Sequence, residues 1–134
     1  MTLPTIAVIG SGVMGEALMK GLLRQSLIEP QHIIGADAWR ERLDSLAAHY
    51  HIRVSSDNAA AAQVADIVFL SVKPQVMSVV LDELRGHVQP GALVFSIAAG
   101  VRIDTLRQGL GVESIIRAMP NTPAQIGQGI TVWT

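Results

Sequence analysis

The sequence predicts a doubly wound α/β fold, in which helices cover both faces of a mostly parallel sheet. Short apolar runs alternate with stretches of helical periodicity along nearly the whole chain, which is typical of consecutive strand–helix units. Several runs are almost wholly apolar, as expected for strands that are buried on both faces. With 134 residues, a hydrophobic content of 49% and a mean hydropathy of +0.39, the chain suffices for one domain with its own core.

In the first half of the chain, Thr5–Ile9 and His32–Ala36 are apolar runs of strand length, and Ile52–Ser55 is expected to form a third, short strand. The helix expected at Val13–Gln25 has apolar residues at intervals of three and four, which places them on one face. The helix expected at Trp39–Tyr50 follows the same pattern. Its buried face is expected to consist of Trp39, Leu43, Leu46, Ala47 and Tyr50.

The second half of the chain continues the alternation. Pro74 suits the first turn of a helix, because the N–H that proline lacks would have no partner in that turn. An alanine-rich helix is expected at 58–64, and further helices are expected at 74–85 and 103–110. Strands are expected at 67–72, 93–97, 114–118 and, at the C-terminal edge of the sheet, 129–133.

A glycine motif joins the first strand to the first helix. Ile6–Gly15 reads IAVIGSGVMG, in which Gly10, Gly12 and Gly15 have the G-x-G-x-x-G spacing. In a dinucleotide-binding turn the first glycine allows a tight turn, the second lets the backbone approach a pyrophosphate, and the third lets the helix pack closely on the strand. The helix N-terminus then offers N–H groups to the phosphates. The motif predicts a Rossmann-type dinucleotide site, and the alternative is a glycine turn in an ordinary α/β domain.

Asp37 follows the second strand, at the edge of the sheet where ligands bind in such folds. A carboxylate there can accept the two hydroxyls of the adenosine ribose and would repel a 2′-phosphate, which favours NAD over NADP. Arg40 and Arg42 follow closely and could offset that repulsion. The alternative role of Asp37 is to cap the N-terminus of the next helix, and the two roles are compatible.

Three later strand ends carry further candidate residues. In Ser71–Pro74, Lys73 could contact a ribose or phosphate oxygen, although a surface lysine before a helix fits equally well. The small side chains of Ile97–Gly100 would let a nicotinamide ring approach the backbone, or they pack at a tight turn. In the Met119–Pro123 loop, Asn121 offers a donor and an acceptor to a substrate, or it is a turn residue. The substrate-side candidates are Met119, Pro120 and Asn121.

Composition argues against several other classes of protein. The net charge of −1 gives no footprint for nucleic acid or for an anionic membrane. There is no cysteine, no cluster with the spacing of metal ligands, and no apolar run of membrane-spanning length. No signal peptide is visible, so the cytoplasm is the expected location. A catalytic role is not expected for the four histidines, which lie away from the predicted ligand edge: His32, His49, His51 and His87.

Four segments together resemble the N-terminal domain of the pyrroline-5-carboxylate reductase family. They are Ile6–Leu22 (IAVIGSGVMGEALMKGL), Phe69–Gln75 (FLSVKPQ), Ser96–Val101 (SIAAGV) and Ile116–Pro123 (IRAMPNTP). The resemblance runs in order over nearly the whole chain. Many dehydrogenases share the glycine motif, whereas the third and fourth segments are far more specific.

The resemblance implies an enzyme that reduces 1-pyrroline-5-carboxylate to L-proline with NADPH or NADH, the last step of proline biosynthesis. It implies a single NAD(P)-binding domain over residues 1–134 and a small-molecule substrate. Transferred position by position, its cofactor contacts fall on Ile9, Gly10, Ser11, Gly12, Val13, Met14, Asp37, Asn58, Ser71, Val72, Lys73, Pro74, Ile97, Ala98 and Ala99, to which the glycine motif adds Gly15.

Members of this family continue into a helical domain that forms the oligomer and binds the substrate carboxylate. We therefore expect this chain to be a fragment or a natural short form that binds cofactor and has low activity or none by itself. A homo-oligomer is possible. Two alternatives remain open. One is another oxidoreductase of the 3-hydroxy acid dehydrogenase type, and the other is a non-catalytic NAD(P)-binding module.

Overall fold

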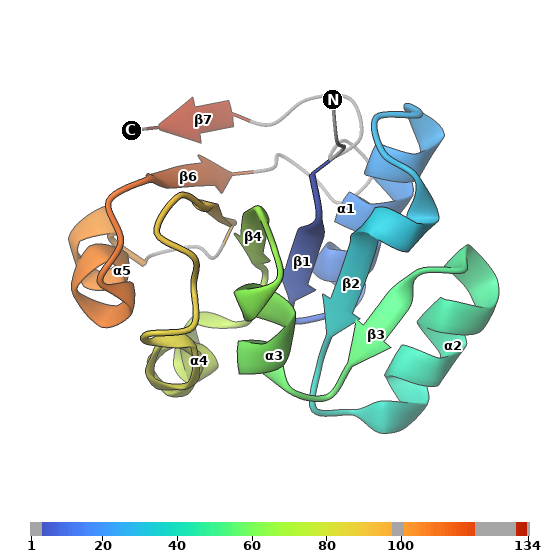
Figure 1. Cartoon of the computed structure of the whole chain (residues 1–134), viewed down its shortest axis with the longest axis horizontal. Helices are drawn as coiled ribbons and strands as arrows, with labels where there is room; N and C mark the ends of the chain where they lie inside the picture. Colours follow the sequence, from blue (N-terminus) through green and yellow to red (C-terminus); the bar gives the residue numbers. More distant parts are fainter. Residues whose placement is uncertain (1–3, 98–100, 120–130, 134) are drawn as a thin grey trace.

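The computed structural model describes residues 4–97, 101–119 and 131–133. The strands in this part of the chain form one seven-stranded sheet, with the order β3-β2-β1-β4-β5-β6-β7 (Figure 1). Strands β1 to β6 run parallel, and β7 pairs antiparallel with β6 at the edge. The strands are β1 (Ile6–Ile9), β2 (Ile33–Ala36), β3 (Arg53–Ser55), β4 (Ile67–Leu70), β5 (Leu93–Ser96), β6 (Ile115–Met119) and β7 (Thr131–Trp133).

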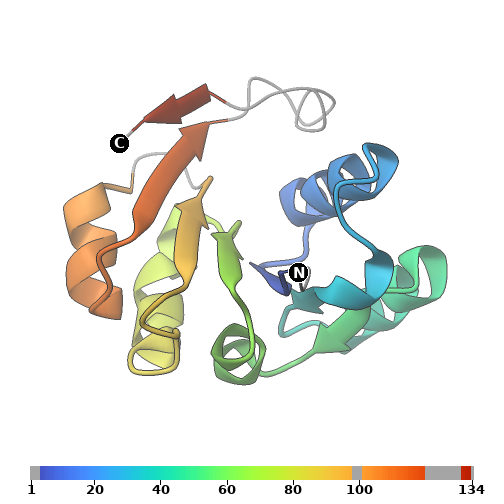
Figure 2. The same ribbon diagram turned by 45° about the horizontal axis from the view of Figure 1, so that its top comes forward.

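The helices form two groups, because the chain adds strands on both sides of β1: β2 and β3 on one side, and β4 to β7 on the other. Right-handed crossovers place the helices of the two halves on opposite faces of such a sheet. Figures 1 and 2 show α4 and α5 side by side, away from α1 and α2. The helices are α1 (Val13–Arg24), α2 (Arg40–Tyr50), α3 (Asn58–Gln63), α4 (Met77–Leu84) and α5 (Ile103–Leu110), with short 3-10 turns at Pro30–His32 and Pro74–Val76.

Alternation along the strands gives the sheet two apolar faces. In β1, Ala7 and Ile9 belong to the core cluster that includes buried residues of α3, α4 and α5. Ile6 and Val8 belong to the other cluster, with buried residues of α1 and α2. Both faces are thus covered at the centre of the sheet, which confirms the predicted fold class and explains the unbroken apolar runs.

Two details of the predicted helices are wrong. Trp39 does not belong to the buried face of a helix, because α2 begins at Arg40 and the Trp39 side chain is 62% exposed. Its backbone is extended, and its N–H donates to the carboxylate of Asp37. Pro74 stands in the first turn of a helical segment, as expected, but this turn is a 3-10 turn and α-helical geometry starts only at Met77. Of the expected edge strand at 129–133, residues 131–133 form β7, and the first two lie outside the described residues.

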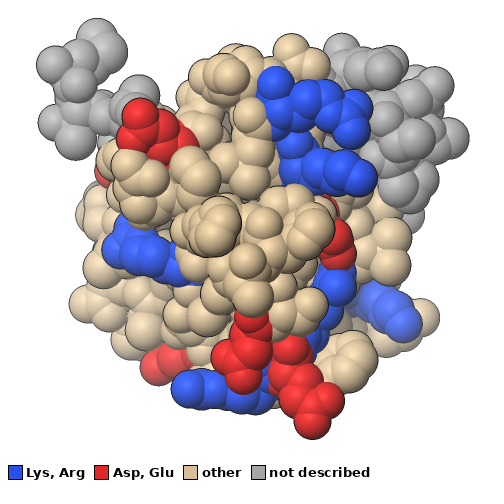
Figure 3. All heavy atoms as spheres, turned by 90° about the vertical axis from the view of Figure 1, so that its right-hand side faces the viewer, with Lys and Arg blue, Asp and Glu red and all other residues tan. Residues whose placement is uncertain are grey.

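The described surface carries charges of both signs. On the face drawn in Figure 3, basic and acidic side chains are interspersed around uncharged residues, and neither sign covers the face. No helix in the described part of the chain is long and apolar enough to cross a membrane. Within the same residues, no group of three or more His, Cys, Asp or Glu could hold a metal ion.

Candidate dinucleotide-binding site

A cleft of about 350 Å³ opens beyond the carboxyl ends of β1, β2 and β4. Strands β1 and β4 are neighbours in the sheet, and the strand order reverses between them. This is where ligands bind in doubly wound folds. The cleft is lined by Gly10, Gly12, Val13, Met14, Asp37, Ser71, Val72, Lys73 and Val76.

Gly10 begins the glycine loop, a name used here for residues Gly10–Gly15. Its φ of +92° lies in the region that favours glycine. A Cβ atom at this position would lie 2.7 Å from Cγ1 of Val72 and 3.0 Å from the carbonyl carbon of Ser71. The N–H of Gly10 donates to the carbonyl oxygen of Ala36 at 2.9 Å. The tight turn after β1 therefore requires a residue without a side chain.

Gly15 and Gly12 serve opposite needs. A Cβ atom on Gly15 would lie 2.2 Å from the carbonyl oxygen of Gly10, so α1 packs directly against the turn. A Cβ atom on Gly12 would meet nothing within 4 Å. Gly12 lines the cleft, and this open space lets a phosphate reach the backbone. The N-terminus of α1 has no side-chain cap, so the first N–H groups of the helix remain suited to an anion.

Ser71 joins the end of β4 to the glycine loop. Its N–H donates to the carbonyl oxygen of Ile9 at 2.9 Å, and its hydroxyl lies 2.5 Å from the carbonyl oxygen of Gly10. The next two residues, Val72 and Lys73, also line the cleft. Lys73 is exposed, and it is the only basic residue among the described residues that line this cleft.

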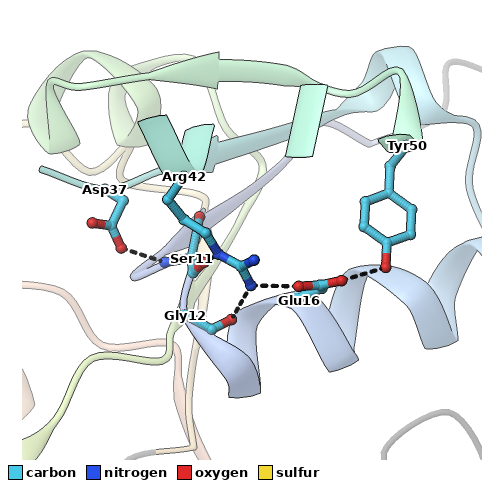
Figure 4. Close-up of polar contacts among 6 residues, drawn as sticks. All are labelled: Ser11, Gly12, Glu16, Asp37, Arg42 and Tyr50. Atoms are coloured by element: carbon cyan, nitrogen blue, oxygen red, sulfur yellow. Dashed lines mark hydrogen bonds and ion pairs between the residues drawn. The ribbon is translucent and has the colours of Figure 1, made fainter. Parts of the chain in front are cut away.

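Asp37 links the glycine loop to the end of β2. Its Oδ2 accepts the N–H of Ser11 at 2.9 Å, and its Oδ1 accepts the N–H of Trp39 at 2.9 Å (Figure 4 shows the first of these bonds). The carboxylate is half-buried and lines the cleft. The alternative role as the cap of α2 is not found, since Trp39 occupies the N-cap position and no side chain caps that helix.

Arg42 contacts the glycine loop from the side of α2 and does not line the cleft. Its Nε donates to the carbonyl oxygen of Ser11 at 2.9 Å, and its Nη2 lies 3.4 Å from that of Gly12 (Figure 4). The same Nη2 forms an ion pair with Glu16. These contacts direct Nε and Nη2 toward the loop carbonyls and Glu16, so the structure does not place Arg42 in the cleft beside Asp37. Arg40 is exposed.

Glu16 connects Arg42 with Tyr50. One oxygen of Glu16 accepts from Arg42, and the other accepts the hydroxyl of Tyr50 at 2.6 Å. The hydrogen bond from Tyr50, followed by the contacts with Arg42, holds the pKa of Glu16 below its usual range. Burial and the bond to Glu16 raise the pKa of Tyr50 to about 12. Glu16 is therefore ionised and Tyr50 neutral at physiological pH.

Other predicted site residues lie away from the cleft lining. Ile9 and the Ser11 side chain are fully buried, and the hydroxyl of Ser11 donates to the carbonyl oxygen of Ala36 at 3.2 Å. Asn58 begins α3, where its Nδ2 lies 3.4 Å from Oε1 of Glu83 and its Oδ1 is buried without a partner among the described residues. The remaining ones are Gly15 within α1, exposed Pro74, and Ile97, which is buried after β5.

Ala98, Ala99, Pro120 and Asn121 lie outside the described residues, and Met119 is the last residue of β6.

Sequence reasoning missed Val76 and the supporting pair of Glu16 and Tyr50. Val76 lines the cleft and is 46% exposed, but in the sequence it is one more apolar residue of an expected helix. Glu16 and Tyr50 are 34 positions apart, and only the packing of α2 against α1 brings them together. An acidic residue in the first turn of a phosphate-binding helix is the one signal that could have drawn attention to Glu16, because its charge would repel phosphate.

Comparison with known proteins agrees with this geometry. A family model described as NADP oxidoreductase, coenzyme F420-dependent, matches residues 5–100. The pyrroline-5-carboxylate reductase of Synechocystis sp. is 43% identical over 126 residues, which cover 94% of this chain and 47% of that protein. The chain thus spans about half the length of the curated relatives it matches.

Solved structures show the same similarity. A pyrroline-5-carboxylate reductase from Coxiella burnetii matches with a TM-score of 0.87 and 31% identity, over 98% of this chain and 48% of that one. The pyrroline carboxylate reductase of Plasmodium falciparum with NADP bound matches with a TM-score of 0.83 and 26% identity, over 99% of this chain and 48% of that one. Since the family model covers most of the chain, the chain belongs to the NADP oxidoreductase, coenzyme F420-dependent family, and its curated relatives are pyrroline-5-carboxylate reductases.

Proposed function

We propose that this chain is the dinucleotide-binding part of a pyrroline-5-carboxylate reductase. The reaction would transfer a hydride from NADH or NADPH to the C=N carbon of protonated 1-pyrroline-5-carboxylate, with L-proline and the oxidised nucleotide as products. The observation that carries the proposal is the cleft at the reversal of strand order, whose lining includes Gly12 with open space at its Cβ position. The names of the relatives supply the substrate.

The residues of the chain would bind and orient the nucleotide. The pyrophosphate would lie over Gly12 and the N-terminus of α1, where N–H groups and the helix dipole favour an anion. Asp37 would accept the hydroxyls of the adenosine ribose, and Lys73 would offer its ammonium group to a phosphate or ribose oxygen. A nicotinamide dinucleotide supplies the hydride when it is bound.

The reaction needs little acid–base catalysis from the residues of this chain. A protonated imine is already a good hydride acceptor, so catalysis consists mainly in holding the two reacting carbons together and excluding water. Met119, Pro120 and Asn121 remain candidates for the substrate side. In the relatives, about half of the length lies beyond the matched part. We propose that this other part provides the contacts to the substrate carboxylate, and that residues 1–134 alone give little turnover.

Two measurements test the proposal separately. The first is calorimetric titration of the chain with NADH and NADPH, for which we expect one nucleotide to bind per chain. The second uses a chimera of residues 1–134 with the second half of the Synechocystis relative, chosen for its 43% identity. We expect the chimera to oxidise NADH or NADPH only when 1-pyrroline-5-carboxylate is present and to release L-proline.

Each failure has its own meaning. A folded chain that binds neither nucleotide would contradict the assigned cleft. A folded chimera that binds nucleotide but forms no proline would contradict the reductase and favour a binding module or another oxidoreductase. Turnover by residues 1–134 at the rate of the chimera would contradict the assignment of the carboxylate contacts to the other half.

A further inference from the structure

Arg42 reaches from α2 to the underside of the glycine loop. Its Nε donates to the Ser11 carbonyl at 2.9 Å, and its Nη2 lies 3.4 Å from the Gly12 carbonyl. The side chain is 24% exposed and does not line the cleft. Two carbonyl groups of the loop are therefore directed toward a cation outside the cleft.

The direction of these carbonyl groups matters for an anionic ligand. A carbonyl oxygen carries partial negative charge and would repel a phosphate, whereas a backbone N–H attracts it. The Gly12 carbonyl also accepts the N–H of Glu16 at 2.9 Å, as the first hydrogen bond of α1. By holding the carbonyls of Ser11 and Gly12 on the far side, Arg42 keeps the N–H side of the loop available to the cleft.

Arg42 also compensates the negative charge of Glu16. Its carboxylate lies in the first turn of α1, the end of the helix at which an anion would bind. An uncompensated negative charge there would oppose the binding of a pyrophosphate. The ion pair with Arg42 and the hydrogen bond from Tyr50 compensate it (Figure 4).

We infer that Arg42 is a positioning residue for dinucleotide binding, which fixes the glycine loop and compensates the charge of Glu16. This inference rests on the proposed nucleotide-binding function. It also makes a prediction about specificity, because Nε and Nη2 of Arg42 contact two carbonyls and one carboxylate and the residue does not line the cleft. Arg42 does not hold the 2′-phosphate that distinguishes NADPH from NADH, so its loss weakens the binding of both nucleotides by the same factor.

The test compares nucleotide affinities of folded variants by calorimetric titration at neutral pH. For Arg42→Ala we expect roughly a tenfold or greater rise in the Kd of NADH and of NADPH alike. Arg42→Lys keeps the charge but cannot contact both carbonyls and the carboxylate at once, so an intermediate loss is expected. Arg40→Ala is the matched control, since it removes the same charge from an exposed residue of the same helix and should leave the Kd of NADH unchanged.

A double variant separates positioning from mere support of the fold. In Arg42→Ala the charge of Glu16 is uncompensated, and Glu16→Gln removes it. Adding Glu16→Gln to Arg42→Ala should therefore recover part of the lost affinity. A purely structural role of Arg42 would instead lower the melting temperature and leave the affinity of the folded fraction unchanged.

Three results would overturn the inference. A loss confined to NADPH would show that Arg42 contacts the 2′-phosphate. An unchanged affinity in both folded variants, Arg42→Ala and Arg42→Lys, would show that the loop needs no support from Arg42. If the unmodified chain bound neither nucleotide, the proposed function would fail first and this inference with it, which distinguishes that case from the other two.

Discussion

The N–H of Ser11 donates a hydrogen bond of 2.9 Å to Oδ2 of Asp37, and this bond joins the glycine loop to the end of β2. Oδ1 of the same carboxylate accepts the N–H of Trp39 at 2.9 Å. An ionised carboxylate has about four acceptor sites, so each oxygen retains the capacity for one more donor. Asp37 is thus fixed at the cleft before any ligand arrives, with acceptors left for two ribose hydroxyls.

This arrangement predicts that the chain binds NADH more tightly than NADPH, because a 2′-phosphate would meet the fixed carboxylate of Asp37. In Asp37→Ser, the Kd of NADH should rise roughly tenfold and the Kd of NADPH should fall. Calorimetric titration of both nucleotides checks this. Asp44→Ser, which removes an exposed carboxylate from α2, is the control and should change neither value strongly. A preference of the unmodified chain for NADPH would contradict the role given to Asp37.

Two alanine variants of the glycine loop, Gly15→Ala and Gly12→Ala, are expected to differ in their effects on stability and on nucleotide binding. In Gly15→Ala the new Cβ would lie 2.2 Å from the Gly10 carbonyl oxygen, and relief of this overlap should cost about 1–3 kcal/mol of unfolding free energy. Alanine favours a helix over glycine by about 1 kcal/mol. This gain is smaller than the upper part of that range, so a net loss of stability is expected there. In Gly12→Ala the Cβ has open space, so the unfolding free energy should change by less than about 1 kcal/mol.

Nucleotide binding should instead be affected more by Gly12→Ala than by Gly15→Ala. The Cβ of Gly12→Ala occupies the space through which a phosphate approaches the backbone, so the Kd of NADH should rise roughly tenfold or more in a fully folded protein. Urea unfolding and calorimetric titration measure the two effects. Tight binding by Gly12→Ala would mean that the pyrophosphate does not lie over Gly12.

The sequence was most informative where neighbours along the chain determine the structure. The turn at Gly10, the start of α1 and the strand ends at Asp37 and Ser71 all depend on local glycine, proline and apolar patterns. Every residue that lines the cleft except Val76 is among the expected cofactor contacts. The N-terminus of α2 was harder to predict from the sequence. A shift of one residue in the helix start places Trp39 outside the helix, where its N–H donates to Asp37.

The support beneath the loop could not be predicted from the sequence. Arg42 is 26 positions from Glu16, and Tyr50 is 34 positions from it. Whether the Arg42 guanidinium turns to the cleft or to the loop carbonyls depends on how closely α2 packs beside α1. That packing is a tertiary property, and charge patterns along one helix do not encode it.

Glu16 should make the stability of the chain depend on pH in the acid range. Its folded-state pKa lies below the ordinary value of 4.5, so ionised Glu16 stabilises the folded state above pH 4.5. This contribution is lost as the pH falls through the folded-state pKa. Urea unfolding of the unmodified chain and of Glu16→Gln should therefore differ at pH 7, on the order of 1 kcal/mol, and the difference should shrink as the pH falls through the folded-state pKa. A difference that grows on acidification would contradict the contacts of Glu16.

Tyr50 offers a direct optical test of the same network, because it is the only tyrosine of the chain. The absorbance of phenolate should report a pKa of about 12 in place of the ordinary 10. The unfolded chain loses this proton near pH 10, so the stabilisation from neutral Tyr50 is complete below pH 10 and disappears as the pH rises to about 12. Glu16→Gln should move the pKa of Tyr50 toward 10 without reaching it, because partial burial remains. Titration of the folded, unmodified chain near pH 10 would mean that the hydroxyl of Tyr50 does not donate to Glu16.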